Sequence, residues 1–158
     1  MFELVNTNRT YFEPWFSWVK TTQKTEDSFC FLFEEESKTV EFKGIGYMIV
    51  LDEQLIGHIS LFNMNLKHKY AEIGYWIDAS HTRKGHMTEA VKLLSKEAFK
   101  NLNIHRLEIL CEKENTASAT VAKKSGFQFE GIIRGVHFNE YKDCFVDLMM
   151  FSRLKTDL

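Results

Sequence analysis

Proline, cysteine and linker-like segments are scarce in this chain of 158 residues. It contains one proline, Pro14, and three widely spaced cysteines, Cys30, Cys111 and Cys144, none of them in a CxxC pair. Because no low-complexity stretch or composition shift divides the chain, we expect residues 1–158 to form one domain. An odd number of separated cysteines argues against a disulfide scaffold or a zinc site and is typical of reduced thiols in the cytoplasm.

Long apolar runs and an excess of one charge are missing as well. No segment approaches the ~20 apolar residues of a membrane-spanning helix, and the N-terminus lacks a basic and then apolar signal pattern. Twenty Lys and Arg against 22 Asp and Glu leave a net charge of −2, and the six histidines are scattered. We therefore expect a cytoplasmic protein that binds no membrane, no metal and, on overall charge, no nucleic acid.

Apolar spacing indicates a mixed α/β protein. Helical periodicity predicts helices over 1–12, 25–37 (with Glu34 to Glu36 exposed), 88–100 and 115–124. Alternating or continuous apolar runs predict strands over 46–50, 54–62, 71–77, 106–111, 127–138 and 144–151. The order of helices, hairpin, strand, helix, strand, helix and hairpin is typical of a layout around one central sheet.

A basic turn before the predicted helix at 88–100 is the first candidate site. The first turn of a helix has unpaired backbone N–H groups and a partial positive charge, and a glycine lets an anion approach them closely. Such an arrangement binds phosphate groups. The alternative is a plain turn in which the glycine only relieves steric strain. The residues concerned are Arg83, Lys84, Gly85, His86 and Thr88.

The segment Asn115-Thr116-Ala117-Ser118 opens the next predicted helix, which ends before Gly126. Asparagine at a helix start is a normal cap, and glycine after a helix is a normal stop. The segment therefore has two interpretations. In one, Asn115 only caps the helix; in the other, its amide and the Ser118 hydroxyl point into a cleft between the flanking strands.

Several segments, taken in order, resemble the GNAT acyltransferase superfamily. The similarity is greatest to the RimJ/RimL type, the N-acetyltransferases of ribosomal proteins. It covers nearly the whole chain, which makes it far more specific than any single motif. The segments are Ala71-Glu72-Ile73-Gly74-Tyr75-Trp76-Ile77, Lys84-Gly85-His86-Met87-Thr88-Glu89-Ala90, Glu114-Asn115-Thr116-Ala117-Ser118, Lys124-Ser125-Gly126-Phe127, Glu130-Gly131 and Phe145-Val146-Asp147.

The resemblance implies a central, mostly antiparallel, twisted sheet with flanking helices. Relatives usually have a β-strand and the beginning of a helix before the equivalent of Phe2-Glu3-Leu4-Val5, so the first strand of the family is expected to be absent here or to precede Met1. Relatives of this type are often homodimers. An unpaired sheet edge would add a physical reason for two copies to associate.

The resemblance also implies where acetyl-CoA, the expected co-substrate, binds. Its pyrophosphate should lie on the backbone N–H groups of residues 84–88, which include Met87. The family's usual Gln or Arg before the loop glycine is Thr82 here, with Arg83 one position late, and its usual small residue is Met87. Backbone donors do not depend on these side chains, so binding should persist.

Strands 71–77 and 106–111 should splay apart, so that the pantetheine arm enters between them. The main chain of residues 76–78, including Trp76 and Ile77, should pair with that arm as an added strand would. Asn115 should hydrogen-bond the pantetheine. Ser118 should lie near the sulfur, where the leaving thiolate takes up a proton.

The expected chemistry is direct attack of a neutral amine on the thioester. An α-amino group with a pKa of about 8 costs roughly 1 kcal/mol to deprotonate near pH 7.4, whereas a lysine amine costs roughly 4. A modest base therefore suffices for a protein N-terminus. Glu72 is the first candidate for this base and Glu112 the second. No histidine adjacent in sequence activates Cys111, which we interpret as core or cleft lining.

Three functions remain open. The first is acetylation of protein N-termini, for which the aromatic loop of Trp15 and Trp18 would wall the acceptor pocket, although large aromatic side chains are also common in cores. The second is acetylation of small amines such as polyamines or amino-sugar antibiotics. The third is a non-catalytic acyl-CoA-binding module.

Overall fold

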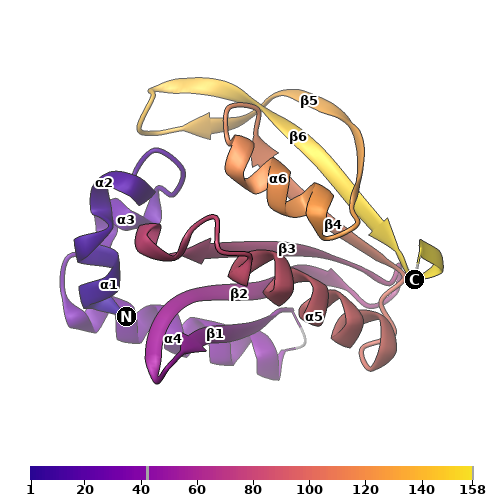
Figure 1. Cartoon of the computed structure of the whole chain (residues 1–158), viewed down its shortest axis with the longest axis horizontal. Helices are drawn as coiled ribbons and strands as arrows, with labels where there is room; N and C mark the ends of the chain where they lie inside the picture. The colour runs from indigo at the N-terminus through magenta and orange to yellow at the C-terminus, as the bar shows by residue number, and fades with distance from the viewer. Residues whose placement is uncertain (42, 158) are drawn as a thin grey trace.

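Six strands form one twisted sheet in the computed structural model, which describes residues 1–41 and 43–157 (Figure 1). Their order across the sheet is β1-β2-β3-β4-β6-β5, and every neighbouring pair is antiparallel except β3 and β4. The strands are β1 (Ile45–Leu51), β2 (Gln54–Asn65), β3 (Tyr70–Ile77), β4 (Arg106–Glu112), β5 (Gln128–Asn139) and β6 (Cys144–Leu154). The mixed α/β, mostly antiparallel sheet predicted from the sequence is confirmed.

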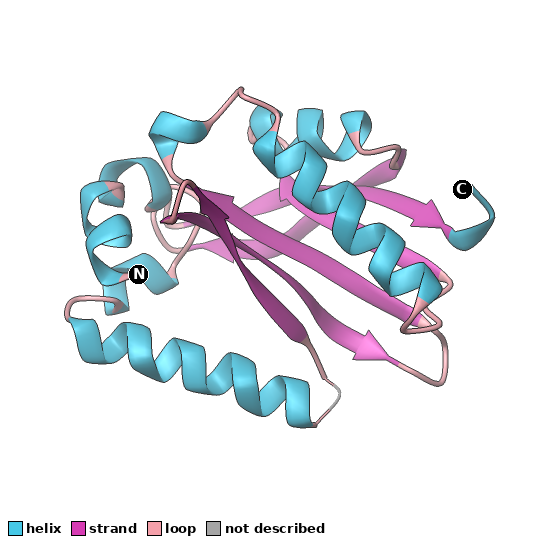
Figure 2. Cartoon of the chain, turned by 60° about the horizontal axis from the view of Figure 1, so that its bottom comes forward, coloured by secondary structure: helices cyan, strands magenta, loops and turns pink. Residues whose placement is uncertain are grey.

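Helices cover both faces of this sheet (Figure 2). One face carries α4 (Thr25–Val40), and the other carries α5 (His86–Lys100) and α6 (Thr116–Lys124). Three short helices, α1 (Phe2–Thr7), α2 (Arg9–Phe12) and α3 (Trp18–Thr21), gather at one end. Single turns of 3₁₀ helix lie at η1 (Ala79–His81) and η2 (Lys155–Asp157). No helix among the described residues is both long and apolar enough to cross a membrane.

Two apolar clusters stabilise this arrangement. The larger lies between the sheet and the pair α5 and α6, and includes the fully buried Phe99, Leu107 and Phe151. Burial of one such side chain contributes about 1.5–3 kcal/mol. The smaller cluster joins the N-terminal helices to the end of β3 through Phe12, Val19 and Trp76, together with Val5. It fixes the aromatic segment beside the end of β3.

The N-terminal helix predicted over 1–12 is in fact two helices that meet at Asn8. This residue leaves the helical conformation, with φ −106° and ψ 12°. Its side-chain amide donates to the Leu4 carbonyl at 2.9 Å, and its Oδ1 accepts from the Ala79 N–H at 2.9 Å. A side chain that bonds backbone groups in this way competes with the helix. The single continuous helix was therefore a wrong prediction.

Helix α4 has the predicted extent with three further residues, but its orientation differs from the prediction. Phe29 and Phe33 are 69% and 70% exposed, whereas the predicted solvent-facing Glu35 turns inward, with a side chain only 14% exposed. The reason lies in the sheet beneath. Glu35 faces the buried His58 of β2, with Oε2 and Nε2 3.7 Å apart. Because His58 is polar, the side of α4 that packs over it carries the polar Glu35 rather than Phe29 or Phe33.

The parallel pair β3 and β4 stays together for only three positions. Tyr70, Ala71 and Glu72 pair with Arg106, Leu107 and Glu108, and the ladder then ends, although both strands continue. On its far side β4 pairs with β6 along its whole length. A gap therefore opens in the middle of the sheet toward the C-terminal ends of β3 and β4, and this is the splay expected from the sequence.

Candidate active site

Three side chains converge on the gap between β3 and β4 from the face covered by α5 and α6. The Tyr75 hydroxyl lies 2.9 Å from the Ser118 hydroxyl and also donates to the Ser118 carbonyl at 3.2 Å. Cys111, at the end of β4, hydrogen-bonds Ser118 and is 7% exposed. Alternation along each strand sends Tyr75 and Cys111 to the same face, so a strand, a second strand and a helix each contribute one group.

Ser118 is held in place by the start of its own helix. Asn115 is the N-cap of α6, and its Oδ1 accepts from the Ser118 N–H at 3.0 Å. The helix ends nine residues later, and Gly126 adopts the left-handed conformation, with φ +86°. The cap expected at Asn115 is therefore present, and it positions the Ser118 hydroxyl at the gap. Contact of the Asn115 amide with a ligand stays a prediction.

Burial sets the protonation of this group. It raises the pKa of Tyr75 well above the usual value, so the phenol keeps its proton at neutral pH. Burial also raises the pKa of the Cys111 thiol. A thiol with a raised pKa is a poor nucleophile. The chemistry available at the gap is consequently proton donation from hydroxyl groups, and Cys111 lines the gap as predicted.

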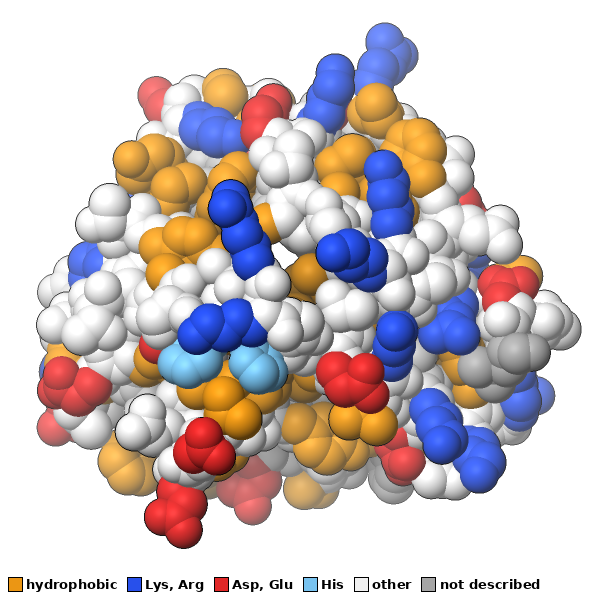
Figure 3. Space-filling view, in the orientation of Figure 1, with side chains coloured by type: hydrophobic (Ala, Val, Ile, Leu, Met, Phe, Trp, Pro, Cys, Tyr) orange, Lys and Arg blue, Asp and Glu red, His pale blue; other side chains and the backbone are white. Residues whose placement is uncertain are grey.

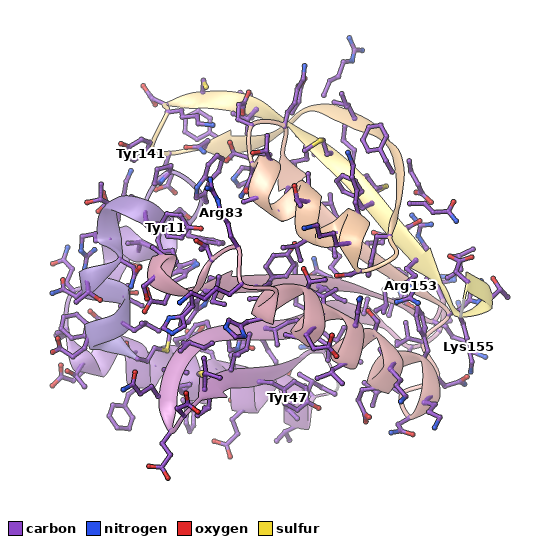
Figure 4. All side chains as sticks on the ribbon, in the orientation of Figure 1. Tyr11, Tyr47, Arg83, Tyr141, Arg153 and Lys155 are labelled. Atoms are coloured by element: carbon purple, nitrogen blue, oxygen red, sulfur yellow. The ribbon has the colours of Figure 1, made fainter. Side chains whose placement is uncertain are left out.

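The start of α5 has the backbone features of an anion site. Gly85 is its N-cap with φ +90°, and no side chain caps this helix end among the described residues. Arg83, two residues earlier, is also left-handed, with φ +61°. Left-handed residues occur in backbone concavities whose N–H groups bind anions. Arg83, Lys84 and Gly85 are exposed, and Figure 4 shows Arg83 reaching out between the N-terminal helices and α6.

Comparison with known proteins assigns the family. The acetyltransferase (GNAT) domain family matches residues 1–128. The chain belongs to the GNAT acetyltransferases. It is 29% identical over 98% of its length to the ribosomal-protein-serine acetyltransferase of Escherichia coli K12, of which it covers 85%. It is also 39% identical to the probable N-acetyltransferase YjcK of Bacillus subtilis, over 65% of this chain and 57% of that protein.

Solved structures show the same fold. One is the microcin C7 self-immunity acetyltransferase MccE in complex with acetyl-CoA and AMP, with a TM-score of 0.90, 24% identity and coverage of 97% of this chain and 84% of that one. Another is RimL, the ribosomal L7/L12 α-N-protein acetyltransferase, in complex with coenzyme A, with a TM-score of 0.91, 23% identity and coverage of 97% and 85%. This GNAT chain is therefore an N-acetyltransferase whose structural neighbours bind acetyl-CoA or coenzyme A.

The main chain of β3 distinguishes two of the predicted cofactor residues of the GNAT enzyme. The Asp78 N–H donates to the Ile56 carbonyl of β2 at 2.8 Å. Because backbone groups alternate in direction along a strand, the N–H and C=O of Trp76 also face β2, and those of Ile77 face the gap. The Trp76 side chain is 6% exposed in the smaller apolar cluster. This geometry favours Ile77 over Trp76 as the backbone partner of a ligand.

The helix-start residues of the enzyme differ in what their side chains offer. Met87 is buried in the larger cluster, so only its backbone N–H is available to a ligand. The His86 ring lies 6.2 Å from that of His81. The Thr88 carbonyl accepts from the Ser125 hydroxyl at 3.3 Å, which ties the first turn of α5 to the end of α6. Their contacts with a cofactor remain predictions.

The aromatic loop meets the β5–β6 hairpin on the other side of the gap. The Asn139 side-chain amide donates to the Pro14 carbonyl at 2.9 Å, and Lys142 lies over the Trp15 ring with its Nζ 5.2 Å from the centroid. Trp18 instead packs with Phe31 and Trp76. Trp15 is thus part of a wall between loop and hairpin, whereas Trp18 belongs largely to the apolar cluster.

The two candidate bases lie in different surroundings. Glu72 occupies the last position at which β3 pairs with β4, and it accepts from the Asn63 amide at 2.9 Å. Glu112, at the end of β4, is 6% exposed and bonds both Asn139 and Lys142, with 2.7 Å between its Oε2 and Lys142 Nζ. Strand alternation places both carboxylates on the face opposite Tyr75. The bond to Glu112 raises the pKa of Lys142.

Sequence reasoning missed three residues of this region. Tyr75 stands within the strand motif quoted for the resemblance, but no chemistry was assigned to it. Asn139 and Lys142 fall in a polar turn whose sequence has no motif, so only the fold brings them to Glu112. Across the described ranges, no cluster of three metal-ligating side chains occurs.

Proposed function

We propose that this enzyme transfers the acetyl group of acetyl-CoA to the N-terminal α-amine of a protein, of the ribosomal-protein type, by direct attack within a ternary complex. The observation that carries the proposal is the gap between β3 and β4, with a protonated hydroxyl pair, Tyr75 and Ser118, on one face and the uncapped start of α5 beside it. A thioester entering there meets proton donors and a phosphate site together.

The cofactor contacts follow from the exposed backbone. The pyrophosphate takes the N–H groups of residues 84–88, with Arg83 and Lys84 adding charge. The pantetheine arm pairs with the N–H and C=O of Ile77 that face the gap. At this position of β3 no pairing with β4 occupies these groups. Asn115 uses its Oδ1 for the cap, which leaves its Nδ2 to donate to a pantetheine carbonyl.

The proton transfers use groups on both faces of the sheet. As the amine attacks the carbonyl carbon, the nitrogen loses a proton to Glu72 or Glu112, directly or through water. When the C–S bond breaks, the thiolate takes a proton from Ser118, which in a concerted transfer recovers one from Tyr75 at 2.9 Å. Tyr75 regains its proton from solvent, and the carboxylate releases the amine proton to solvent. Holding both substrates in line supplies a large share of the rate, since effective molarities reach about 10⁵ M or more.

The acceptor side supports a peptide substrate. The wall formed by Trp15, Asn139 and Lys142 borders the face where Glu72 and Glu112 lie. The relative that matches 98% of the chain is named for acetylation of a ribosomal-protein serine. Because an α-amine is already partly neutral near pH 7.4, these carboxylates suffice as bases for an N-terminus and are weak bases for a lysine side chain.

The test is acetyl-CoA turnover with matched acceptors. Thiol release is measured with short peptides bearing a free N-terminus, with the same peptides blocked at the N-terminus but containing lysine, and with small amines including polyamines. We expect release with the free N-termini only, and a mass increase of one acetyl group at the first residue. Turnover restricted to small amines would assign the enzyme to metabolite or antibiotic acetylation and refute the proposed acceptor.

A further inference from the structure

A strongly basic groove lies on the same face as the gap, farther along α5. It has a volume of about 470 Å³ and lies between the second half of α5, the end of α6 and the last residues of β6. Its lining contains five cationic side chains together with Ser125 and Gly126, and no carboxylate. The cations are Lys92, Lys96, Lys100, Lys124 and Arg153. Figure 3 shows Lys and Arg side chains gathered over this part of the face.

The fold holds these charges together rather than scattering them. Lys92, Lys96 and Lys100 recur every four residues, which places them on one side of α5 in a row of roughly 12 Å. Arg153 donates from Nη1 to the Ser125 carbonyl at 3.0 Å, and a side chain at position 126 would bring a Cβ within 3.4 Å of its guanidinium carbon. Gly126 therefore lets the arginine lie against the end of α6 (Arg153 is labelled in Figure 4).

The charges are not balanced within the fold. Among the described residues none of the five cations takes part in an ion pair, while ten pairs form elsewhere. The Nε atom of Arg153 is buried, and it has no hydrogen-bond partner among the residues that the structure describes. Like charges four residues apart on a helix destabilise it. A row of such charges, retained without acidic partners in a chain of net charge −2, indicates an external anion.

The length of the lysine row on α5 indicates which kind of anion fits it. Thr88 is the last residue of the expected pyrophosphate site, and Lys92 lies one helical turn beyond it. Lys96 and Lys100 lie roughly 12 and 18 Å beyond Thr88 along the axis. A pyrophosphate bound at residues 84–88 would lie near Lys92 but roughly 18 Å from Lys100, so it would leave the far end of the row unoccupied. An extended chain of phosphates matches the whole row.

We propose that this groove docks the phosphate backbone of RNA. Lysine and arginine bind the phosphates of a nucleic acid whatever its base sequence. The groove is open and no aromatic side chain lines it, so we expect contacts with phosphates rather than with bases. The choice of RNA rests on the proposed function, because a ribosomal protein is a component of an assembly that contains RNA. Contact with RNA would hold the enzyme near such an acceptor and leave the opposite face of the sheet, where Glu72 and Glu112 lie, free for the acceptor.

The test measures binding of a short, fluorescently labelled single-stranded RNA of mixed sequence by anisotropy, between about 50 and 200 mM salt. The test variant is Lys96→Glu with Lys100→Glu, since both side chains are exposed and neither belongs to the pyrophosphate loop. The matched control is Lys43→Glu with Lys67→Glu, which changes the net charge equally at exposed positions. We expect at least about tenfold weaker RNA binding in the test variant only. The slope of log K against log salt concentration should fall by about 1.4 in magnitude, because each of the two lost phosphate contacts contributes about 0.7.

Other outcomes overturn the proposal. It fails if the wild-type enzyme binds no RNA at the lowest salt, or if test and control variants bind equally. It also fails if the test variant keeps its RNA affinity but needs more acetyl-CoA, while acetyl-CoA lacking the 3′-phosphate is used equally well by all proteins. That result would assign the groove to the cofactor's nucleotide.

The same proteins are assayed with free peptides, which separates the two proposals. Weaker RNA binding with unchanged peptide acetylation supports the docking groove. Absence of peptide acetylation by the wild-type enzyme, with RNA binding intact and sensitive to the substitutions, refutes the proposed acceptor and leaves the groove supported.

Discussion

Ser118 and Tyr75 are each partly buried residues that acquire a role only as a pair. Their hydroxyl oxygens lie 2.9 Å apart, and burial keeps the phenol protonated. A hydroxyl pair of this kind can deliver a proton to a leaving thiolate without any group of unusual acidity. Cys111, which touches the same serine, has its thiol pKa raised by burial, so the residue with the most reactive side chain in free solution contributes the least chemistry here.

Removal of the serine hydroxyl should slow the chemical step. We expect Ser118→Ala to lower kcat about 10²-fold with little change in KM for acetyl-CoA, because general acid catalysis typically contributes this much. Tyr75→Phe should lower it less, and the double variant should be no slower than Ser118→Ala, since the two act as one unit. Steady-state thiol release checks this.

The matched control for the serine is Thr120→Ala. This residue of the same helix is exposed, and among the described residues its hydroxyl bonds only the Thr116 carbonyl. A comparable fall in kcat for Thr120→Ala would attribute the effect to the helix rather than to the hydroxyl at the gap.

At the scale of elements, α4 is attached to the sheet through a buried histidine. His58 is 4% exposed, stacks on Trp76 and faces Glu35. Its pKa is lowered, first by burial and also by Lys38, although Glu35 acts in the opposite direction. The folded protein therefore binds a proton at this site less readily than the unfolded chain, whose histidine titrates near 6.5.

This difference predicts the sign of a pH effect. The contribution of His58 to the free energy of unfolding is fully present above pH about 6.5 and is lost as the pH falls below that value, because protonation then favours the unfolded chain. Urea denaturation at a series of pH values should show a shallower decline for His58→Gln than for the wild-type protein. The exposed His68→Gln serves as the control, and equal slopes for all three proteins would contradict the assignment.

The β5–β6 hairpin is tied to the aromatic loop through Asn139. Its amide group donates to Pro14 and Glu112, and its Oδ1 accepts from the N–H groups of Tyr141 and Lys142 at 2.9 Å each. The residue is 4% exposed. One side chain thus connects three segments that border the acceptor face.

Loss of this side chain should affect the acceptor more than the cofactor. Asn139→Ala leaves buried polar groups without partners, which should cost about 1–3 kcal/mol of unfolding free energy. We expect a higher KM for the peptide and an unchanged KM for acetyl-CoA. Asn101→Ala, which removes an exposed amide from the end of α5, is the control. An equal rise in both KM values for Asn139→Ala would place the hairpin on the cofactor side.

For the whole molecule, cofactor binding should stabilise the folded state, because the ligand would contact both sides of the gap between β3 and β4. At a concentration 100 times its Kd, acetyl-CoA should add about 2.7 kcal/mol to the free energy of unfolding. For a chain of this size the Tm should rise by about 5–10 °C. Thermal unfolding with and without the ligand measures the shift.

Acetyl-pantetheine is the comparison ligand, because it lacks the pyrophosphate. At equal concentration it should raise the Tm less, since it leaves the start of α5 unused. Equal shifts for both ligands would remove residues 84–88 from the cofactor site.

The homodimer implied by the family resemblance stays a prediction at this scale. In the described part of the chain, β1 is one edge of the sheet, and it exposes Tyr47 and Val50. Light scattering of the purified protein determines the number of copies.

The sequence by itself determined the element order, the position of the glycine turn before α5, the serine at the start of α6 and the family. These features are local, since a helix start, a left-handed glycine and an N-cap each depend on a few consecutive residues. Tertiary structure alone decided that Asn8 divides the first helix, that Glu35 and not Phe33 faces the sheet, and that Tyr75 meets Ser118. It also brought five cations into one groove of a chain whose net charge is −2. Each of these depends on side chains far apart in sequence, and overall charge says nothing about where charges lie once the chain has folded.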